Sequence, residues 1–240
     1  MREGKLGEKL KFITGSDAVD IDECALLAHA VEAIAQGGRA SPMDSSTCSH
    51  GHVVVLSDSV EEGIEWQYSR KLTTPEGERE WQIHTVKPPA NDVYLVIGNT
   101  GIHAPTSKQV EKVALMLKNN PERMKEIETI GVIAKRGIKS LLNGDYDSVG
   151  RAMSENQLML QSIGVSSPEL ESLIQAAAPS SLGAKLTGAG GGGCMVALTR
   201  DPKTTSEAIE LAGGRTIISS FGAKGLTIEE ATEAPLWLTN

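Results

Sequence analysis

A run of glycines near the C-terminal end is the feature of this sequence that most directly suggests chemistry. Residues 188–193 read Gly-Ala-Gly-Gly-Gly-Gly, and the apolar segment 194–199 follows them. Glycine gives up side-chain packing and has a high entropic cost, so such a run is useful where backbone must approach another backbone or a phosphate closely and offer its N–H groups. A flexible hairpin turn is the alternative interpretation of the same residues.

Two familiar glycine motifs are excluded by what surrounds the run. Gly188, Gly190 and Gly193 have the spacing G-x-G-x-x-G, but a dinucleotide-binding fold needs a helix directly after the glycines, and here a strand is predicted. Protein kinases do place a glycine loop between two strands. The V-A-I-K, H-R-D and D-F-G tracts of those enzymes are nevertheless absent from these 240 residues.

Asp44 is the first of two carboxylates whose setting suggests a role. It lies in the small, polar segment 39–49, which contains Pro42 and which we expect to be a loop that exposes the carboxylate. The alternative is an aspartate that forms a local turn with Ser45 and Ser46.

Glu32 is the second carboxylate, and it is predicted to point towards the interior of the fold. It follows Ala28 by four residues and Ala25 by seven, on one face of an expected helix. An inward carboxylate needs a partner, and a nearby base is one possibility. His29, on a neighbouring part of this face, is expected to be a hydrogen-bonded structural histidine.

The elements that would position these residues predict an α+β fold. Asp20 and Glu23 have capping-box spacing, and a helix is predicted over 21–36, where the glycine pair 37–38 stops it. Its expected buried face comprises Ile21, Cys24, Ala25, Ala28, Val31 and Ala35. The other expected elements are strands at 52–56, 93–97, 194–199 and 216–219, a hairpin over 66–86 with its turn at 74–77, helices beginning near Thr106, Pro121, Asp145 and Pro168, and a helix at 204–211.

Composition and charge limit the class of partner. The chain has 23 Lys plus Arg against 31 Asp plus Glu, a net charge of -8, and no local basic patch, which disfavours nucleic acid and anionic membrane surfaces. The three cysteines have neither disulfide-framework nor zinc-site spacing, and no stretch reads as a signal peptide or a membrane span. We expect a cytoplasmic protein that binds a small molecule.

Three segments, in order along the chain, resemble conserved motifs of the GHMP kinases in the form used by mevalonate kinases, particularly archaeal ones. The segment 185–198, Lys-Leu-Thr-Gly-Ala-Gly-Gly-Gly-Gly-Cys-Met-Val-Ala-Leu, resembles the third motif. The segment 40–44, Ala-Ser-Pro-Met-Asp, resembles the loop of the catalytic aspartate, and 96–106 resembles the strand and loop that line the substrate pocket. The resemblance implies a two-domain GHMP kinase fold, with residues 1–88 as a truncated N-terminal domain and 91–240 as a complete C-terminal α+β domain.

The resemblance also implies roles for individual residues in phosphoryl transfer from ATP to an alcohol, with Mg²⁺. It makes Asp44 the catalytic base, Glu32 a Mg²⁺ ligand, Gly188, Gly190 and Gly191 nucleotide-binding residues, and Thr106 and Ala189 substrate-binding residues. Thr106 and Gln109 also have capping-box spacing, so Thr106 is expected to start a helix as well. Arg39 could assist a phosphate, although an exposed surface arginine is the simpler interpretation.

One family element has no counterpart in these 240 residues. A Gly-Leu-Gly-Ser-Ser-Ala phosphate loop is expected before the helix that carries Glu32, and only Gly15-Ser16 is found there. We expect a truncated gene model, a split enzyme or a loss of catalysis, and weak ATP binding by the isolated chain, since the helix N-terminus that receives the phosphates is missing. The link from Glu32 to Asp44 is also one residue longer than is usual in the family, which leaves their register open.

The expected function is therefore phosphorylation of mevalonate to 5-phosphomevalonate in isoprenoid biosynthesis, by a homodimeric enzyme. Two alternatives stay open. One is a related GHMP kinase with another substrate, such as phosphomevalonate. The other is a catalytically inactive GHMP domain that binds a ligand or a partner chain.

Overall fold

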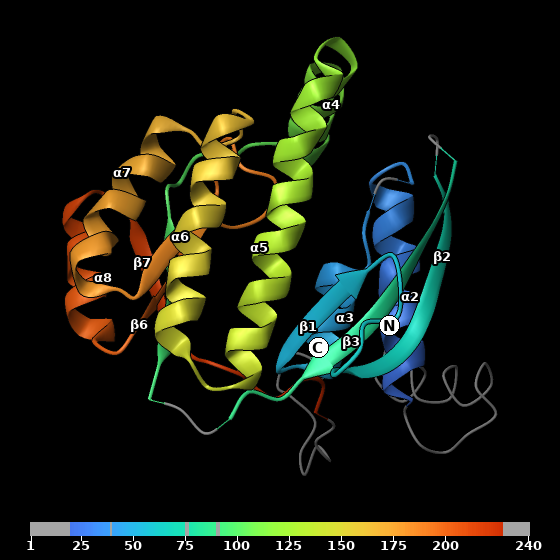
Figure 1. The fold of residues 1–240 in the computed structure, drawn as a ribbon, viewed down its shortest axis with the longest axis horizontal. Helices are drawn as coiled ribbons and strands as arrows, with labels where there is room; N and C mark the ends of the chain where they lie inside the picture. The colour runs from blue at the N-terminus through green and yellow to red at the C-terminus, as the bar shows by residue number, and fades with distance from the viewer. Residues whose placement is uncertain (1–19, 39, 75–76, 90–91, 228–240) are drawn as a thin grey trace, which may run out of the picture. The chain divides into compact units, whose positions relative to one another are not determined.

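The computed structural model describes residues 20–38, 40–74, 77–89 and 92–227, and these form two units. Unit 1 contains the residues up to Lys87 together with those from Gly222 onward, and unit 2 is Pro88–Phe221. Each unit has its own antiparallel sheet and its own helices (Figure 1). The expected α+β class is confirmed.

Unit 1 combines a three-stranded sheet with two helices. Its elements are α2 (Ile21–Ala35), α3 (Met43–His50), β1 (Val53–Ser57), β2 (Glu65–Thr74) and β3 (Gly77–Val86), with the strand order β1-β3-β2. The predicted helix, first strand and hairpin are confirmed, while turn residues 75–76 and Arg39 lie outside the described residues. Asp20 caps α2 as expected, because its Oδ1 accepts the N–H of Asp22 at 2.8 Å.

The buried face of α2 differs from the predicted one. It consists of Ala25, His29 and Ala33, which are spaced by four residues. On the expected face, Val31 is 69% exposed and Ala28 is exposed too. The prediction was wrong because it considered only apolar side chains. The face that is buried in unit 1 carries two alanines and a histidine whose ring nitrogens are hydrogen-bonded.

The end of the described chain belongs to unit 1. Gly51 forms an antiparallel bridge with Lys224, the His52 N–H donates to the Ala223 carbonyl at 2.6 Å, and the Leu226 N–H donates to the Ser49 carbonyl at 2.9 Å. The sequence analysis predicted that the second domain continues to residue 240. The structure instead assigns residues 222–227 to the first unit.

Unit 2 is built on a four-stranded antiparallel sheet in the order β5-β6-β4-β7, the split β-α-β arrangement with additional helices after its first strand. Its elements are β4 (Tyr94–Asn99), α4 (Thr106–Asn119), η1 (Pro121–Arg123), α5 (Met124–Leu142), α6 (Tyr146–Ser162), α7 (Pro168–Ala177), η2 (Ala178–Ser180), β5 (Gly183–Leu186), β6 (Cys194–Thr199), α8 (Pro202–Leu211) and β7 (Arg215–Ser220). The expected strands and helices of this region are all confirmed, and β5 is an additional strand. In the part of the chain that the structure describes, no helix meets the length and hydropathy needed to cross a bilayer.

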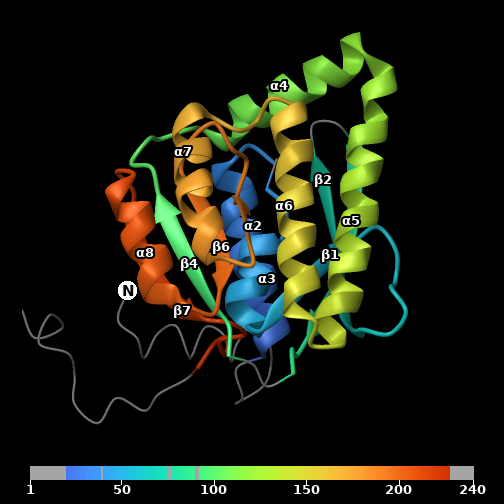
Figure 2. The ribbon, with the colours of Figure 1, turned by 60° about the vertical axis from the view of Figure 1, so that its left-hand side comes forward.

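The core of unit 2 lies where α7 and α8 pack on one face of the sheet (Figure 2). Four buried residues of α7 recur at intervals of three and four, so one stripe of the helix faces the strands. The core residues are Val96, Ile163, Val165, Leu170, Leu173, Ile174, Ala177, Ala184, Leu186, Met195, Ala197 and Ile209.

Helix α6 closes the β5 edge of this sheet by direct backbone contact. A Cβ on Gly183 would lie 1.9 Å from the carbonyl oxygen of Gly150, so both glycines are needed for the close approach of helix and strand. The buried Gln157 then completes the hydrogen bonding of the strand, since its Oε1 accepts the Leu186 N–H at 2.9 Å. An exposed sheet edge would otherwise present unpaired backbone groups to water.

Candidate active site

The glycine run forms a tight loop between β5 and β6 that is held by two other segments of unit 2. The Gly191 N–H donates to the Val165 carbonyl at 2.7 Å, and the Gly193 N–H donates to the Ile102 carbonyl at 2.8 Å. The Gly193 carbonyl in turn accepts both the N–H and the Oγ1 of Thr100, each at 2.9 Å. The loop is therefore anchored at Gly191 and at Gly193. Its interpretation as a flexible turn was wrong.

The need for glycine is strongest at positions 190 and 191. Both residues have positive φ angles, of 83° and 76°. A Cβ at Gly190 would lie 2.1 Å from the Val165 carbonyl oxygen, and one at Gly191 would lie 2.2 Å from Nε2 of Gln109. Gly188 also has a positive φ, of 74°, but a Cβ there would meet no atom within 4 Å.

These contacts decide which N–H groups of the loop are free to bind an anion. The N–H of Gly191 is already bonded to Val165, so Gly191 offers no donor to a phosphate. The N–H groups of Gly188, Ala189 and Gly190 have no acceptor within the described residues. A row of such unpaired donors in a turn of positive-φ residues is suited to an anion.

Thr106 is placed differently from the prediction. It is the first residue of α4, whereas Pro105 occupies the N-cap position, and no side chain caps this helix. The predicted capping box was wrong because Gln109 turns away from the helix start and packs against Gly191. Thr106 is exposed and close in sequence to Ile102, which holds the loop, so its proposed substrate role is untouched by this correction.

Gln109 is a site residue that the sequence analysis missed. Its Oε1 is buried without a hydrogen-bond partner in the described residues, and its amide lies against the glycine loop. Its place in the Thr106–Gln109 pattern suggested a helix cap, and no other sequence signal indicates this contact.

Lys185, three residues before the glycine run begins at Gly188, is a second group that was not predicted. Burial lowers the pKa of its ammonium group. Its Nζ donates to the Leu186 carbonyl at 2.8 Å. A partly buried cation thus lies at the entry to the loop.

Asp44 and Glu32 both belong to unit 1, and the structure corrects the setting of Asp44. It lies in the first turn of helix α3, where a loop was expected. Its carboxylate is exposed, and no hydrogen bond or salt bridge reaches it from the residues that the structure describes. An exposed carboxylate without a protein partner remains available to a ligand.

Helix α3 forms although its sequence is rich in serine and threonine. The hydroxyls of Ser45 and Thr47 donate back to carbonyls of the preceding turn, at 3.3 Å and 2.7 Å. Ser46 is fully buried, and its Oγ lies 2.9 Å from the Tyr68 hydroxyl of β2. Tertiary burial therefore overrides the turn preference of these residues, and the expected turn around Asp44 is replaced by a helix.

Glu32 is half-buried on α2, and its partner is neither a base nor an acid. Gln36 donates its Nε2 to Glu32 Oε1 at 3.0 Å, one helical turn away. Among the described residues, no group of three or more His, Cys, Asp or Glu could hold a metal ion. Mg²⁺ commonly uses one or two carboxylates together with phosphate oxygens and water, so Glu32 could supply one ligand but not a site by itself.

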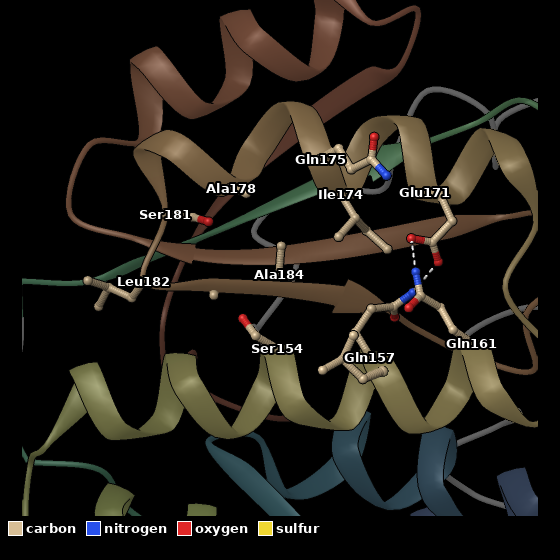
Figure 3. Close-up of a pocket in the computed structure, with 12 residues that line it drawn as sticks. Ser154, Gln157, Gln161, Glu171, Ile174, Gln175, Ala178, Ser181, Leu182 and Ala184 are labelled. Atoms are coloured by element: carbon tan, nitrogen blue, oxygen red, sulfur yellow. Dashed lines mark hydrogen bonds between the residues drawn. The ribbon is translucent and has the colours of Figure 1, made fainter.

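The cavity shown in Figure 3 contains none of the predicted site residues. It measures about 280 Å³ and lies between α6, α7 and the start of β5. Its polar groups largely satisfy one another, since Gln157 Nε2 donates to Glu171 Oε1 at 2.6 Å and Gln161 donates to the other carboxylate oxygen. We therefore place the candidate site at the glycine loop and not in this cavity.

Comparison with known proteins shows what the fold and the loop are similar to. Residues 138–213 match the family model for the GHMP kinases C-terminal region, which includes the glycine loop. The fold is similar to that of L. major mevalonate kinase in complex with R-mevalonate, with a TM-score of 0.61 and 24% identity over 85% of this chain and 60% of that one. It is also similar to *Streptococcus pneumoniae* phosphomevalonate kinase, with a TM-score of 0.65 and 18% identity over 89% of this chain and 65% of that one. The resemblance to GHMP kinases is confirmed.

The sequence is also similar to those of curated mevalonate kinases. The mevalonate kinase of Pyrococcus furiosus is 35% identical over 150 residues, and that of Thermococcus onnurineus is 37% identical over 155 residues. Each match covers 59% of this chain and 45% of the relative. The chain thus spans about half the length of the curated relatives that it matches, and it resembles archaeal mevalonate kinases.

Proposed function

We propose that this chain is part of an ATP-dependent kinase that phosphorylates mevalonate to 5-phosphomevalonate. The observation that carries the proposal is the anchored glycine loop. Within it, the N–H groups of Gly188, Ala189 and Gly190 have no acceptor among the described residues. The identity of 35–37% to two archaeal mevalonate kinases supports the choice of substrate. In this proposal the N–H groups bind phosphate, and Thr106 and Ala189 contact the alcohol.

The proposed reaction needs one protein group that accepts a proton. The alcohol oxygen attacks the γ-phosphorus, the bond between the γ-phosphorus and the bridging oxygen breaks, and ADP leaves with that electron pair. Asp44 would accept the hydroxyl proton, since its carboxylate is exposed and has no partner in the described residues. Mg²⁺, with Glu32 as one ligand, would neutralise phosphate charge.

A second substrate stays open because the fold does not separate the two. The TM-score is 0.65 to a phosphomevalonate kinase and 0.61 to a mevalonate kinase, and both similarities concern the fold alone. Phosphomevalonate differs from mevalonate by a charged phosphate, so the two substrates can be separated directly in an assay. A catalytically inactive domain is the remaining alternative.

The test is ADP release with ATP·Mg²⁺ and either mevalonate or phosphomevalonate by the whole kinase of which this chain is proposed to be a part, because weak ATP binding is expected of the isolated chain. In that protein we expect turnover with mevalonate, and a fall of about 100-fold or more in Asp44→Asn because a positioned base is lost. Asp58→Asn is the matched control, since Asp58 is also exposed in unit 1, and it should leave turnover unchanged. Because Asp44 is exposed, its substitution should not change the melting temperature.

Three results would contradict parts of this proposal. Preference for phosphomevalonate would reassign the substrate. Near-normal turnover of Asp44→Asn would remove this residue from the mechanism. Absence of turnover in the wild-type form of that whole protein with both substrates would favour the inactive domain.

A further inference from the structure

His29 is fully buried in unit 1 and bonded through both ring nitrogens. Its Nδ1 accepts a hydrogen bond from Nε of Arg70 at 2.8 Å, and its Nε2 lies 3.0 Å from the carbonyl oxygen of Ala40. The ring of Trp81 packs edge-on against it, with 6.1 Å between centroids and 88° between planes. The imidazole therefore links strand β2, through Arg70, to the segment that precedes helix α3.

The partners of His29 determine which of its two ring nitrogens carries a proton. Arginine Nε always carries a proton, so Nδ1 of His29 must be the acceptor. The proton of the neutral ring then lies on Nε2, which donates to Ala40. This arrangement gives the hydrogen bond to Ala40 a fixed direction, and it orients the peptide group that leads into α3.

A second tether from the same strand reaches the other side of Asp44. Ala40 lies four residues before Asp44, and the buried Ser46 lies two residues after it, where its Oγ is 2.9 Å from the Tyr68 hydroxyl. The Ser46 N–H donates to the Pro42 carbonyl at 3.0 Å and so closes the first turn of α3. Strand β2 thus holds the backbone on both sides of an exposed carboxylate that has no hydrogen bond of its own among the described residues.

We propose that His29 and Arg70 are positioning residues that fix the start of α3 and thereby the carboxylate of Asp44. The proposal rests on the proposed function, in which Asp44 is the catalytic base. It explains how α2 can bury a histidine: an unbonded buried ring would be unfavourable, whereas this one has a partner at both nitrogens. Neither residue contacts the substrate in this proposal.

The first measurement is hydrogen exchange of backbone amides, which needs no enzymatic activity. In His29→Ala the amide of Ser46 should exchange about tenfold faster or more, since the bond that holds Ala40 is lost. His29→Gln should restore much of the protection, because the Gln side-chain amide can replace the Nε2 donor. His84→Ala is the control: His84 is equally buried, but its Nε2 accepts the Glu61 N–H, and among the described residues it has no hydrogen bond to α3.

The second measurement is the kinetics of the same variants. We expect His29→Ala and Arg70→Met to lower kcat by about tenfold or more with little change in KM for the alcohol, because the base is displaced and the binding groups are not. His29→Gln should recover kcat in parallel with the amide protection.

The outcomes separate this proposal from the proposed function. If His29→Ala leaves the Ser46 amide unchanged, or accelerates exchange throughout unit 1 as His84→Ala does, the positioning role is refuted. If wild-type protein shows no turnover, the proposed function fails, and hydrogen exchange alone still decides whether His29 holds α3.

Discussion

The glycine loop of unit 2 and the α2–α3 segment of unit 1 differ in what determines their conformation. In the loop, positive φ angles demand glycine, and a Cβ at Gly190 or Gly191 would lie about 2 Å from neighbouring backbone or side-chain atoms, so the sequence itself records the requirement. In α2–α3, small and polar residues are compatible with several structures, and contacts from strand β2 select one of them. A backbone requirement is therefore readable in sequence, whereas a packing requirement depends on distant residues.

The largest expected effect tests the loop. Gly190→Ala should destabilise the protein by about 2–5 kcal/mol, because strained φ and a clash with the Val165 carbonyl oxygen add together. Gly188→Ala is the matched control, since its φ is equally positive but its surroundings are open. It should cost only about 1 kcal/mol. Chemical denaturation measures both; equal costs would mean that Val165 does not restrain the loop.

An intermediate effect tests which face of α2 is buried. Ala33→Leu should destabilise the protein by about 1–3 kcal/mol, because Ala33 is 4% exposed and a larger side chain would overpack the interior. Ala28→Leu makes the same change at an exposed position of the same helix and should stay within about 0.5 kcal/mol. Thermal unfolding of the two variants checks this, and a larger cost at Ala28 would restore the face expected from the sequence.

The smallest effect concerns Lys185 and depends on pH. Burial lowers its pKa in the folded state, so Lys185→Met should raise the melting temperature by about 1–3 °C near neutral pH. Below the pKa of Lys185 in the folded state, its ammonium group is charged in both the folded and the unfolded state, and the full cost of burying the charge is present. As pH rises from there to the unfolded pKa of about 10.4, the cost disappears and so should the advantage of the variant.

Lys203→Met is the control for that measurement, because the Lys203 side chain is 85% exposed. Its melting temperature should match that of the wild type at every pH. An advantage of Lys185→Met that persists well above pH 10.4 would show that the gain comes from packing and not from removal of a charge.

The sequence predicted the features that are encoded locally. The Asp20 cap places the start of α2, the glycine pair 37–38 marks its end, and the glycine run marks a loop between two strands. Each of these depends on backbone conformation or on a hydrogen bond within a few residues. The match of residues 138–213 to the GHMP family confirms the resemblance that the glycine motif indicated.

The rest depends on contacts that the sequence does not specify. Helix α3 was expected to be a loop, because the burial of Ser46 against Tyr68 spans 22 residues of chain. The capping box at Thr106 was wrong because Gln109 packs on a loop that is distant in sequence. The spacing of the glycines also could not show that the Gly191 N–H donates to the Val165 carbonyl. The assigned roles of Asp44, Glu32 and Thr106 stay predictions.

The sheet of unit 2 ends differently on its two sides, and this limits how copies of the chain could join. Helix α6 occupies the β5 side through Gly150, Gly183 and Gln157, whereas β7 on the other side pairs only with β4 among the described strands. A sheet with two open edges can add neighbours indefinitely and grow into a fibre. One with a single open edge can accept one neighbour, and two such sheets joined at β7 have no edge left. Association through strands would then stop at a pair, so loss of the glycine contact at α6 would be expected to convert a self-limiting surface into a polymerising one.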